Sequence, residues 1–519
     1  MKYTSFLGLF LPVLASAQIT VAPQELQFPT TEYGNTDSIE VTLTNNYSVD
    51  VNLTAVAFEQ VYGNDVFYAP QAPTALNAGQ SASFWVYFEP EHNIEHNSEM
   101  VILTDYRGAI SVDVTGDGEF ANSYYDNTFN LSEEDLKSAL KTILAAGYNQ
   151  LGYNIARDNM YGSLDNVSGD VECVYTGRTA TFNDRPGANA NSFNCEHTFI
   201  QSLFGGSDPM VSDIHHLFPT DIQANSERGA LAFGVVNGTP SWQDGGSKKG
   251  GGVFEPRDVQ KGATARAMMY FVTRYQDYSN FFAGQETILR QWHEDFDPNA
   301  SEIQRNNGIY SLQHNRNPYV DYPQFIERIQ VLSGTSVAPQ VDSLFISTDT
   351  IDLEDENIDL AYRLILCNRG NQAIEVSNFQ FSDAAFYFQN TVGTETIEAG
   401  ESLELIVTTS MDLPEGSIEA LTFDTDIQNG TTQTVVLKGG WYPSSIEEKL
   451  QDAAFKVYPN PTTAEFTYPV KRNENALVID ANGRLVKTCE DSPCSVRELP
   501  AGWYIVKVAE KEALLIKRD

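Results

Sequence analysis

The chain has 519 residues, with 32 Lys and Arg against 70 Asp and Glu, so its formal net charge at pH 7 is −38. This length exceeds what one hydrophobic core serves, so we expect several domains, and the excess of acid argues against a general affinity for polyanions. The charge is uneven: residues 121–330 hold 16 basic and 25 acidic residues, a net of −9, and the rest carries −29. At physiological salt the Debye length is about 8 Å, so the acidic flanks barely affect a central site.

The N-terminus has the features of a secretory signal peptide over residues 1–17. Lys2 provides the positive charge, Phe6–Leu14 is a short apolar run, and residues 15–17 form a small-residue cleavage site. The apolar run is far shorter than the roughly 20 residues that a membrane-spanning helix needs. No later stretch is long and apolar enough, so we expect a secreted protein, either extracellular or attached to the cell surface.

Two segments, 19–120 and 337–441, alternate apolar and polar residues between turn signals, as the half-buried strands of a β-sandwich do. They share short motifs at matching places: NAGQS at 77–81 with EAGES at 398–402, and LTNN at 43–46 with LCNR at 366–369. Both segments resemble the small immunoglobulin-like sandwiches of bacterial surface proteins, and we interpret them as two copies of one domain. A role as spacer or stalk is favoured, and specific ligand binding is the alternative.

The segment between them, 121–332, has a different character and predicts an α+β domain. Residues 132–135 have the pattern of a capping box, and apolar residues at helical spacing follow from Leu136 to Leu144. A second long helix is predicted over 257–275. Between the two helices lie loops rich in Asn, Gly and Asp, and such loops on a helical frame often carry function.

The C-terminal part predicts a linker over 442–454 and a small β-domain over 455–519. This domain opens with FKVYPNPT at 455–462 and nearly closes with LPAGWYIVKV at 499–508. Both motifs resemble those of the C-terminal sorting domain of the type IX secretion system, which implies the machinery of that system as a partner. The alternative is a third small β-domain without a sorting role.

Two segments of the central domain could carry chemistry. They are NCEHTFIQSLF at 194–204, and SDIHHLFP at 212–219 with Asn225 and Arg228 after it. Cutting a phosphodiester requires a base that deprotonates water, and a neutral imidazole suits that role near pH 7. It also requires stabilisation of the phosphorane charge, which a hard cation held by carboxylate and amide oxygens provides. The histidines do not form the HExxH helix of a zinc enzyme.

These segments resemble the endonuclease I family, periplasmic and secreted nucleases with a His-Me finger (ββα-metal) site. The Glu-His pair with its Gln-Ser, the Asp-x-His-His-Leu-x-Pro segment and the Asn-x-x-Arg motif all match, within a resemblance over about 125–332. The resemblance implies that His197 is the general base and that Glu196 and Asn225 hold Mg²⁺, for which Mn²⁺ or Ca²⁺ could substitute. It further implies hydrolysis of DNA, and of RNA as well, to 5′-phosphate products without sequence preference.

The motifs do not identify which arginine contacts the phosphate. Arg228 lies three residues after Asn225, so on a helix the two share a face, and Arg228 could hold the phosphate as a catalytic residue. A structural ion pair of Arg228 with Asp213 or Asp221 is the alternative. Arg185 is a second candidate for the substrate phosphate.

The sequence departs from the family pattern in two places. Ile200 replaces a proline that is common there, and no arginine lies in 198–224, where some members have a phosphate-binding one. The adjacency of Glu196 and His197 adds a constraint, because neighbouring residues of a regular strand face opposite ways. The two side chains can share a site only if the backbone is irregular there.

The remaining polar residues of the motifs are expected to support the site. His215 and His216 are expected to shape the finger. Arg316 with Asp321 is expected to be scaffold, and contact of Arg316 with substrate is the alternative.

The five cysteines of an exported chain allow two disulfides and one free thiol. Cys489 and Cys494 are close enough in sequence to close a small loop, and Cys173 could pair with Cys195 in the central domain. Cys367 is then the free thiol. No CxxC pair indicates structural zinc.

Together these features predict a multidomain protein, in which an α+β His-Me finger nuclease domain is flanked by immunoglobulin-like sandwiches and followed by a small β sorting domain. The expected function is that of a secreted, metal-dependent, sequence-nonspecific endonuclease, acting as a monomer on DNA or RNA. The alternative is a surface adhesion protein whose degenerate nuclease domain only binds. The intact Glu196, His197 and Asn225 favour the enzyme.

Overall fold

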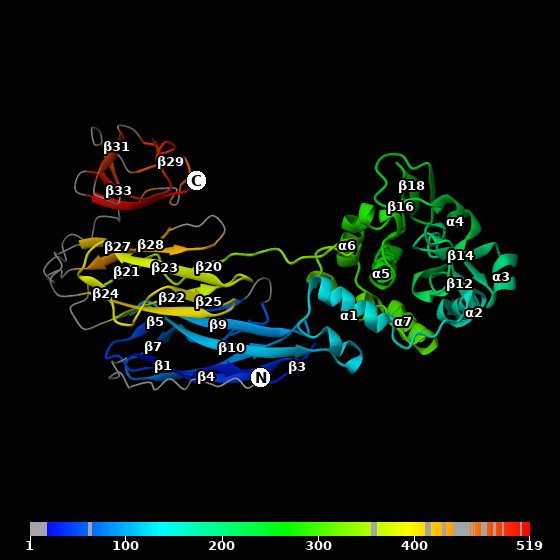
Figure 1. Ribbon diagram of the computed structural model, residues 1–519, viewed down its shortest axis with the longest axis horizontal. Coiled ribbons are helices and arrows are strands. Elements are labelled where there is room, and N and C mark those ends of the chain that lie inside the picture. The colour runs from blue at the N-terminus through cyan, green and yellow to red at the C-terminus, as the bar shows by residue number, and fades with distance from the viewer. Residues whose placement is uncertain are drawn as a thin grey trace. The chain divides into compact units, whose positions relative to one another are not determined.

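The computed structural model (Figure 1) describes residues 18–60, 65–353, 361–409, 417–427, 432–439, 457, 460, 462–468, 475–480, 484–489, 492–508 and 511–518. The chain forms two compact units, Met1–Gly440 and Trp441–Asp519. The predicted signal peptide at 1–17 and the predicted linker at 442–454 lie outside the described residues.

The N-terminal part of the first unit is a β-sandwich, drawn in blue in Figure 1. One sheet has the order β1 (Ile19–Ala22), β4 (Asp37–Asn45), β8 (Ser81–Phe88), β6 (Phe67–Tyr68). The other has the order β2 (Leu26–Gln27), β10 (Ala109–Glu119), β9 (Glu95–Thr104), β5 (Val51–Gln60), β7 (Ala75–Leu76), with β3 (Thr31–Glu32) beside β10. Both sheets bury their alternate apolar residues in one core, as the periodicity predicts.

A second sandwich follows the central domain. Its sheets have the orders β20 (Leu344–Ile346), β22 (Tyr362–Asn368), β26 (Ser402–Thr409), β24 (Phe386–Phe388), and β21 (Thr350–Asp352), β28 (Thr432–Gly439), β27 (Ser417–Thr425), β23 (Ile374–Phe381), β25 (Glu395–Ile397). Matched in chain order, with β3 set aside, the two sandwiches have the same strand order in both sheets. The predicted internal repeat is therefore visible in the topology, whereas the immunoglobulin-like assignment stays a prediction.

One buried asparagine explains why the repeat leaves a trace in the sequence. The Asn45 side chain donates to the carbonyls of Val49 (2.8 Å) and Leu76 (3.0 Å) and accepts from the Tyr47 amide (2.9 Å). Asn368 of the second sandwich donates to two carbonyls and accepts from one amide in the same pattern. Each of these buried side chains thus satisfies three backbone groups that the strands leave unpaired, which a hydrophobic residue could not do.

Asn45→Ala should therefore destabilise the first sandwich by about 2–3 kcal/mol, because two buried carbonyls and one amide lose their partner. Hydrogen–deuterium exchange of peptides from 37–88 in the full chain measures this domain alone. Asn46→Ala, at the exposed neighbour, is the matched control and should change the exchange little. Equal protection in both variants would mean that Asn45 has no structural role.

The central domain packs its helices around α5 (Asp258–Arg274), which is buried along most of its length and confirms the helix predicted over 257–275. The other helices are α1 (Glu133–Ala145), α2 (Tyr153–Asn159), α3 (Arg185–Ala190), α4 (Ile222–Arg228), α6 (Glu286–Asp295), α7 (Ala300–Gln313) and α8 (Pro318–Asp321). Its sheets are small and are formed by β11 (Asn166–Val167), β12 (Asp170–Glu172) and β13 (Thr179–Thr181); by β14 (Phe193–His197) and β15 (Leu217–Asp221); and by β16 (Ala232–Phe233), β19 (Val253–Glu255), β18 (Ser247–Gly250) and β17 (Trp242–Asp244).

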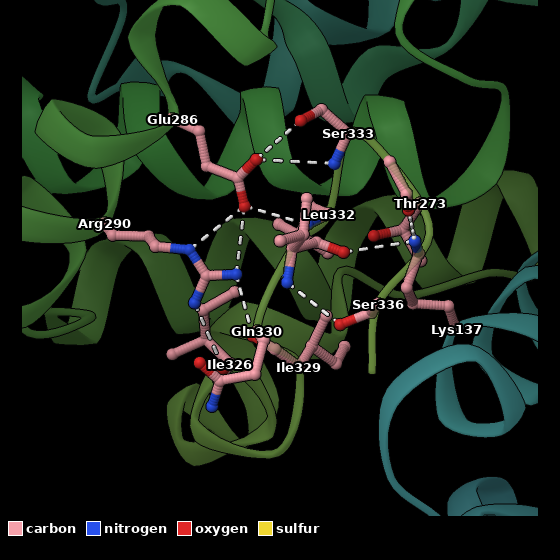
Figure 2. A network of polar contacts seen from close by, with 12 residues as sticks. Lys137, Thr273, Glu286, Arg290, Ile326, Ile329, Gln330, Leu332, Ser333 and Ser336 are labelled. Carbon is pink, nitrogen blue, oxygen red and sulfur yellow. Dashed lines mark hydrogen bonds and ion pairs between the residues drawn. The ribbon is translucent and has the colours of Figure 1, made fainter. Parts of the chain in front are cut away.

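The end of this domain is tied back onto α6 by the network in Figure 2. Glu286 accepts hydrogen bonds from Arg290 (3.0 Å) on its own helix, from the Leu332 amide (2.8 Å) and from the Ser333 hydroxyl (2.7 Å). Because the carboxylate is shared between the helix and the chain segment, the segment after the last helical turn cannot move independently of α6.

The start of α1 corrects one prediction. Ser132 is the N-cap residue, but its side chain makes no capping hydrogen bond, so the predicted capping box is not formed. The acidic residues of the first turn bind elsewhere: Glu134 accepts from the Ser336 amide (2.6 Å) and from Lys137 (2.7 Å). Glu134 therefore bonds a chain segment about 200 residues away instead of the start of its own helix, and local spacing does not reveal such a partner.

The second unit contains a small β-domain, as predicted. Its strands are β29 (Glu465–Phe466) paired with β32 (Cys494–Ser495), and the sheet β31 (Leu485–Cys489), β30 (Ala476–Asp480), β33 (Gly502–Val508), β34 (Lys511–Lys517). The predicted disulfide Cys489–Cys494 is formed. Among the residues that the structure describes, no helix is long and apolar enough to cross a membrane.

Candidate active site

The motif residues lie on a strand–strand–helix unit. β14 pairs antiparallel with β15 at five consecutive positions, from Phe193 opposite Asp221 to His197 opposite Leu217, without a register shift. The helix α4 begins directly after β15 and ends before Gly229, whose backbone leaves the helical conformation. The hairpin with its helix is the ββα arrangement that the sequence predicts.

Glu196 and His197 point to opposite faces of this hairpin. Asn194 and Glu196 contact residues of α4 on one face, whereas the His197 ring packs on the other face against Tyr153, with ring centroids 5.4 Å apart. The strand is regular through His197, so it lacks the irregular backbone that would bring both side chains to one face. What the two residues share is the end of β14, since His197 is its last residue.

Glu196 is buried with only one of its two oxygens engaged. Oε1 accepts from the Tyr175 hydroxyl (2.8 Å) and lies 3.1 Å from Nε of Arg228. Burial raises the pKa of Glu196, and the Arg228 charge and the Tyr175 hydrogen bond oppose that rise. Oε2 has no hydrogen-bond partner in the described part of the chain, so it is open to a ligand.

Asn225 presents its amide oxygen in the same way. Its Nδ2 donates to Asn194 Oδ1 (2.9 Å) and to the Cys195 carbonyl (3.2 Å), which turns Oδ1 away from the strand. Oδ1 of Asn225 and Oε2 of Glu196 are the two oxygens on this face that could hold a hard cation. No cluster of three or more His, Cys, Asp or Glu suited to a metal occurs within the described residues.

The His197 ring is held in its neutral form. Its Nε2 lies 3.2 Å from the Val211 carbonyl, and because a carbonyl only accepts, the ring hydrogen belongs on Nε2 and the lone pair on Nδ1. Burial lowers the pKa of His197 to about 3, and the neighbouring His216 adds to the shift. The imidazole is therefore uncharged at neutral pH, with one ring nitrogen fixed by the backbone and the other able to accept a proton.

The Asp-x-His-His segment serves the scaffold. Asp213 is fully buried and accepts from Arg274 (2.6 Å) and Tyr270 (2.7 Å); burial alone would raise its pKa, but Arg274 and the two histidines hold it well below its ordinary value. His215 and His216 each place Nε2 against a backbone carbonyl, of Asn315 (3.2 Å) and Met210 (2.7 Å). These contacts fit the predicted role of both histidines in shaping the finger.

Comparison with known proteins agrees with this geometry. Residues 132–324 match the family model for endonuclease I, and residues 456–518 match that for a secretion system C-terminal sorting domain. An extracellular ribonuclease of Bacillus subtilis (strain 168) is 30% identical over 232 residues, which are 40% of this chain and 78% of that protein. The chain belongs to the endonuclease I family. An extracellular deoxyribonuclease of Aeromonas hydrophila is 31% identical over 117 residues, 22% of this chain and 50% of that protein.

As a member of the endonuclease I family the protein is a nuclease, and its sorting domain together with extracellular relatives identifies it as secreted. The sorting domain was predicted from the motifs at both of its ends, of which 499–508 contains β33, the strand between β30 and β34.

Arg228 is the ion-pair partner of Glu196 rather than of the residues predicted. It is 1% exposed, and it donates to the carbonyls of Thr198 (2.6 Å) and Gly229 (2.9 Å). Its contact with Glu196 is electrostatic, because Nε makes no hydrogen bond there. The predicted partners Asp213 and Asp221 pair with other arginines. These contacts enclose the guanidinium, so a phosphate would have to displace them, and the catalytic role of Arg228 stays a prediction.

The other predicted substrate arginines also have protein partners. Arg185 donates to Asp158 (2.8 Å) and remains 34% exposed, so its contact with substrate stays a prediction. Arg316 binds both oxygens of Asp321 at 2.6 Å and also Asn307 (2.7 Å), which are the contacts of a scaffold residue. A substrate contact of Arg316 has no support in its surroundings.

The predicted disulfide between Cys173 and Cys195 is not formed, and both thiols are free and buried, as is Cys367. The Cys173 sulfur contacts Thr220 (3.4 Å), which pairs with Asn194 and so faces the side of the hairpin opposite to Cys195. The two thiols are thus separated by the hairpin itself.

The residues that orient the motif were not predicted from the sequence. Tyr175 and the Val211 carbonyl hold Glu196 and His197, and Tyr153 with Arg157 lies beside His197. None of these four residues belongs to the motif segments. The sequence could have predicted only whether each lies in a helix or in a loop, not that it contacts Glu196 or His197.

Arg228→Met should destabilise the central domain by about 3–5 kcal/mol, because the Glu196 carboxylate is left buried without its counter-charge. Glu196→Gln in the same chain should restore most of this loss, since the remaining pair is neutral. Urea denaturation followed by exchange of peptides from 193–228 measures both. If the Arg228→Met chain were as stable as the unmodified protein, the ion pair would not be structural, and Arg228 would again be a candidate for contact with the substrate phosphate.

Proposed function

We propose that the protein is a metal-dependent, sequence-nonspecific endonuclease that hydrolyses DNA, and RNA as well, to 5′-phosphate products. The observation that carries the proposal is the neutral His197, fixed through Nε2 at the end of β14, where the free oxygens of Glu196 and Asn225 lie across the strand. The names of the relatives support both substrates, because one is a ribonuclease and another a deoxyribonuclease.

His197 supplies the base in this proposal. Nδ1 takes a proton from the attacking water, and the Val211 carbonyl stabilises the resulting imidazolium through Nε2–H. Burial favours the neutral ring before the reaction, and the phosphate that enters with substrate offsets the charge formed during it.

Glu196 and Asn225 would hold the cation, which we propose to be Mg²⁺, with Mn²⁺ or Ca²⁺ as substitutes. Such an ion supplies charge neutralisation at the phosphorane and the leaving oxygen. The protein's part is orientation: Tyr175 and Arg228 fix the Glu196 carboxylate, and Asn194 fixes the Asn225 amide, so that both oxygens stay directed to the same side.

Lack of sequence preference follows if the contacts go to phosphate and sugar rather than to base edges. The type IX secretion machinery would recognise the C-terminal sorting domain and deliver the enzyme to the cell surface or the medium. The sandwiches would then act as spacers, and the enzyme would act as a monomer.

His197→Ala should leave a folded protein whose plasmid nicking is at least about 100-fold slower, the usual loss when a general base is removed. Glu196→Gln and Asn225→Ala should slow nicking and raise the Mg²⁺ concentration at half-maximal rate. The assay compares supercoiled and nicked plasmid with and without EDTA.

His314→Ala is the matched control, because His314 lies at the end of α7 outside the motifs, and it should cleave normally. Normal cleavage by His197→Ala would refute the role of His197 as general base. Cleavage by the unmodified chain in EDTA would refute the proposed metal dependence.

A further inference from the structure

Nearly all arginines of the nuclease domain are neutralised within the protein. Of the eleven in 121–332, all described, nine form ion pairs with carboxylates, and the two others are Arg157 and Arg328. Arg328 directs its donors to Asn93 Oδ1 (2.7 Å) and to the carbonyls of Thr128 (3.0 Å) and Leu131. Arg157 is therefore the one guanidinium of this domain that has neither a carboxylate nor a full set of carbonyl partners among the described residues.

Arg157 lies next to the proposed base. It belongs to α2, and its guanidinium carbon stacks 4.0 Å above the centre of the Tyr153 ring. The Tyr153 ring in turn packs against the His197 ring, with centroids 5.4 Å apart. The arginine and the imidazole thus share the same face of β14.

Most hydrogen-bond donors of Arg157 are unused. Nη2 donates to Asn154 Oδ1 (2.8 Å), and this is its one hydrogen bond within the described structure. Nε is buried without any partner. A guanidinium carries five N–H donors in a planar fork, so beside the buried Nε–H and the donor used on Asn154, three donors on Nη1 and Nη2 remain for a ligand. A phosphate oxygen matches this fork in charge and geometry.

We propose that Arg157 binds a phosphate of the nucleic acid strand on the His197 side of β14. This inference rests on the proposed function and assigns the phosphate contact that the sequence left open. No arginine lies in 198–224, Arg228 is enclosed by its own partners, and Arg157 has the free donors at the right place. The Tyr153 ring keeps the guanidinium plane oriented, and the phosphate contact holds the substrate against Nδ1 of His197.

The test uses the full chain with His197→Ala, so that substrate binds without being cut. Arg157→Gln in this background should weaken binding of a labelled duplex of about 20 base pairs by about 10- to 100-fold, the loss of one charge-assisted contact. It should also reduce the slope of log Kd against log salt concentration by about 1, because one phosphate contact is removed.

Two further variants make the result specific. Lys141→Gln removes the same charge from an exposed position on α1 and should leave both Kd and the slope unchanged. Arg157→Lys should keep the slope, because a lysine also neutralises one phosphate, and should bind with intermediate strength because the fork is lost. In the cleaving enzyme, Arg157→Gln should lower kcat/KM by a similar factor.

The outcomes separate this inference from the function it rests on. If the unmodified chain cleaves DNA but Arg157→Gln binds like Lys141→Gln, the phosphate contact is refuted and the nuclease stands. If Arg157→Gln lowers kcat with an unchanged salt slope, Arg157 only positions His197 through Tyr153, and the proposal is equally overturned. A chain that neither binds nor cleaves nucleic acid would refute the proposed function itself.

Discussion

The buried contact between Arg228 and Glu196 is the constraint on which the site depends. It joins Arg228, the last residue of α4, to Glu196, which directly precedes the proposed base on β14. The two side chains are 1% and 3% exposed. Taking both charges out of water is expensive, and the attraction between them, the Tyr175 hydrogen bond to Glu196 and the donation of Arg228 to the Thr198 carbonyl offset that cost. Since Asn225 lies one turn earlier on α4, the same contact fixes the distance between the two candidate ligands.

The sequence predicted those parts of the molecule whose signals are local. The sandwich repeat was visible because Asn45 and Asn368 each bond backbone groups two and four residues further along the chain, and because the turns before β8 and β26 contain Gly79 and Gly400 at positive φ, 68° and 81°. The disulfide between Cys489 and Cys494 closes a short loop, so its partners were equally local.

What could not be predicted depends on register and on distant partners. The pairing of Cys173 with Cys195 was wrong because the two thiols lie on opposite faces of the hairpin, and the face that each takes depends on the pairing of β14 with β15, which no spacing within β14 specifies. Arg228 forms an ion pair, as the structural alternative predicted, but with Glu196 rather than with Asp213 or Asp221, and the partner was set by the packing of α4 against β14.

The same pairing of charges explains how an acidic protein could bind a polyanion. A nuclease with a basic surface binds through many phosphate contacts, and its affinity falls steeply with salt. Here nine of the eleven arginines of the nuclease domain form internal ion pairs, so attraction to the substrate would come mainly from the cation held by Glu196 and Asn225 and from the guanidinium of Arg157. Few contacts mean a shallow dependence on salt. A secreted enzyme gains from this, because at the ionic strength outside the cell, where charges beyond about 8 Å are screened, long-range attraction would contribute little in any case.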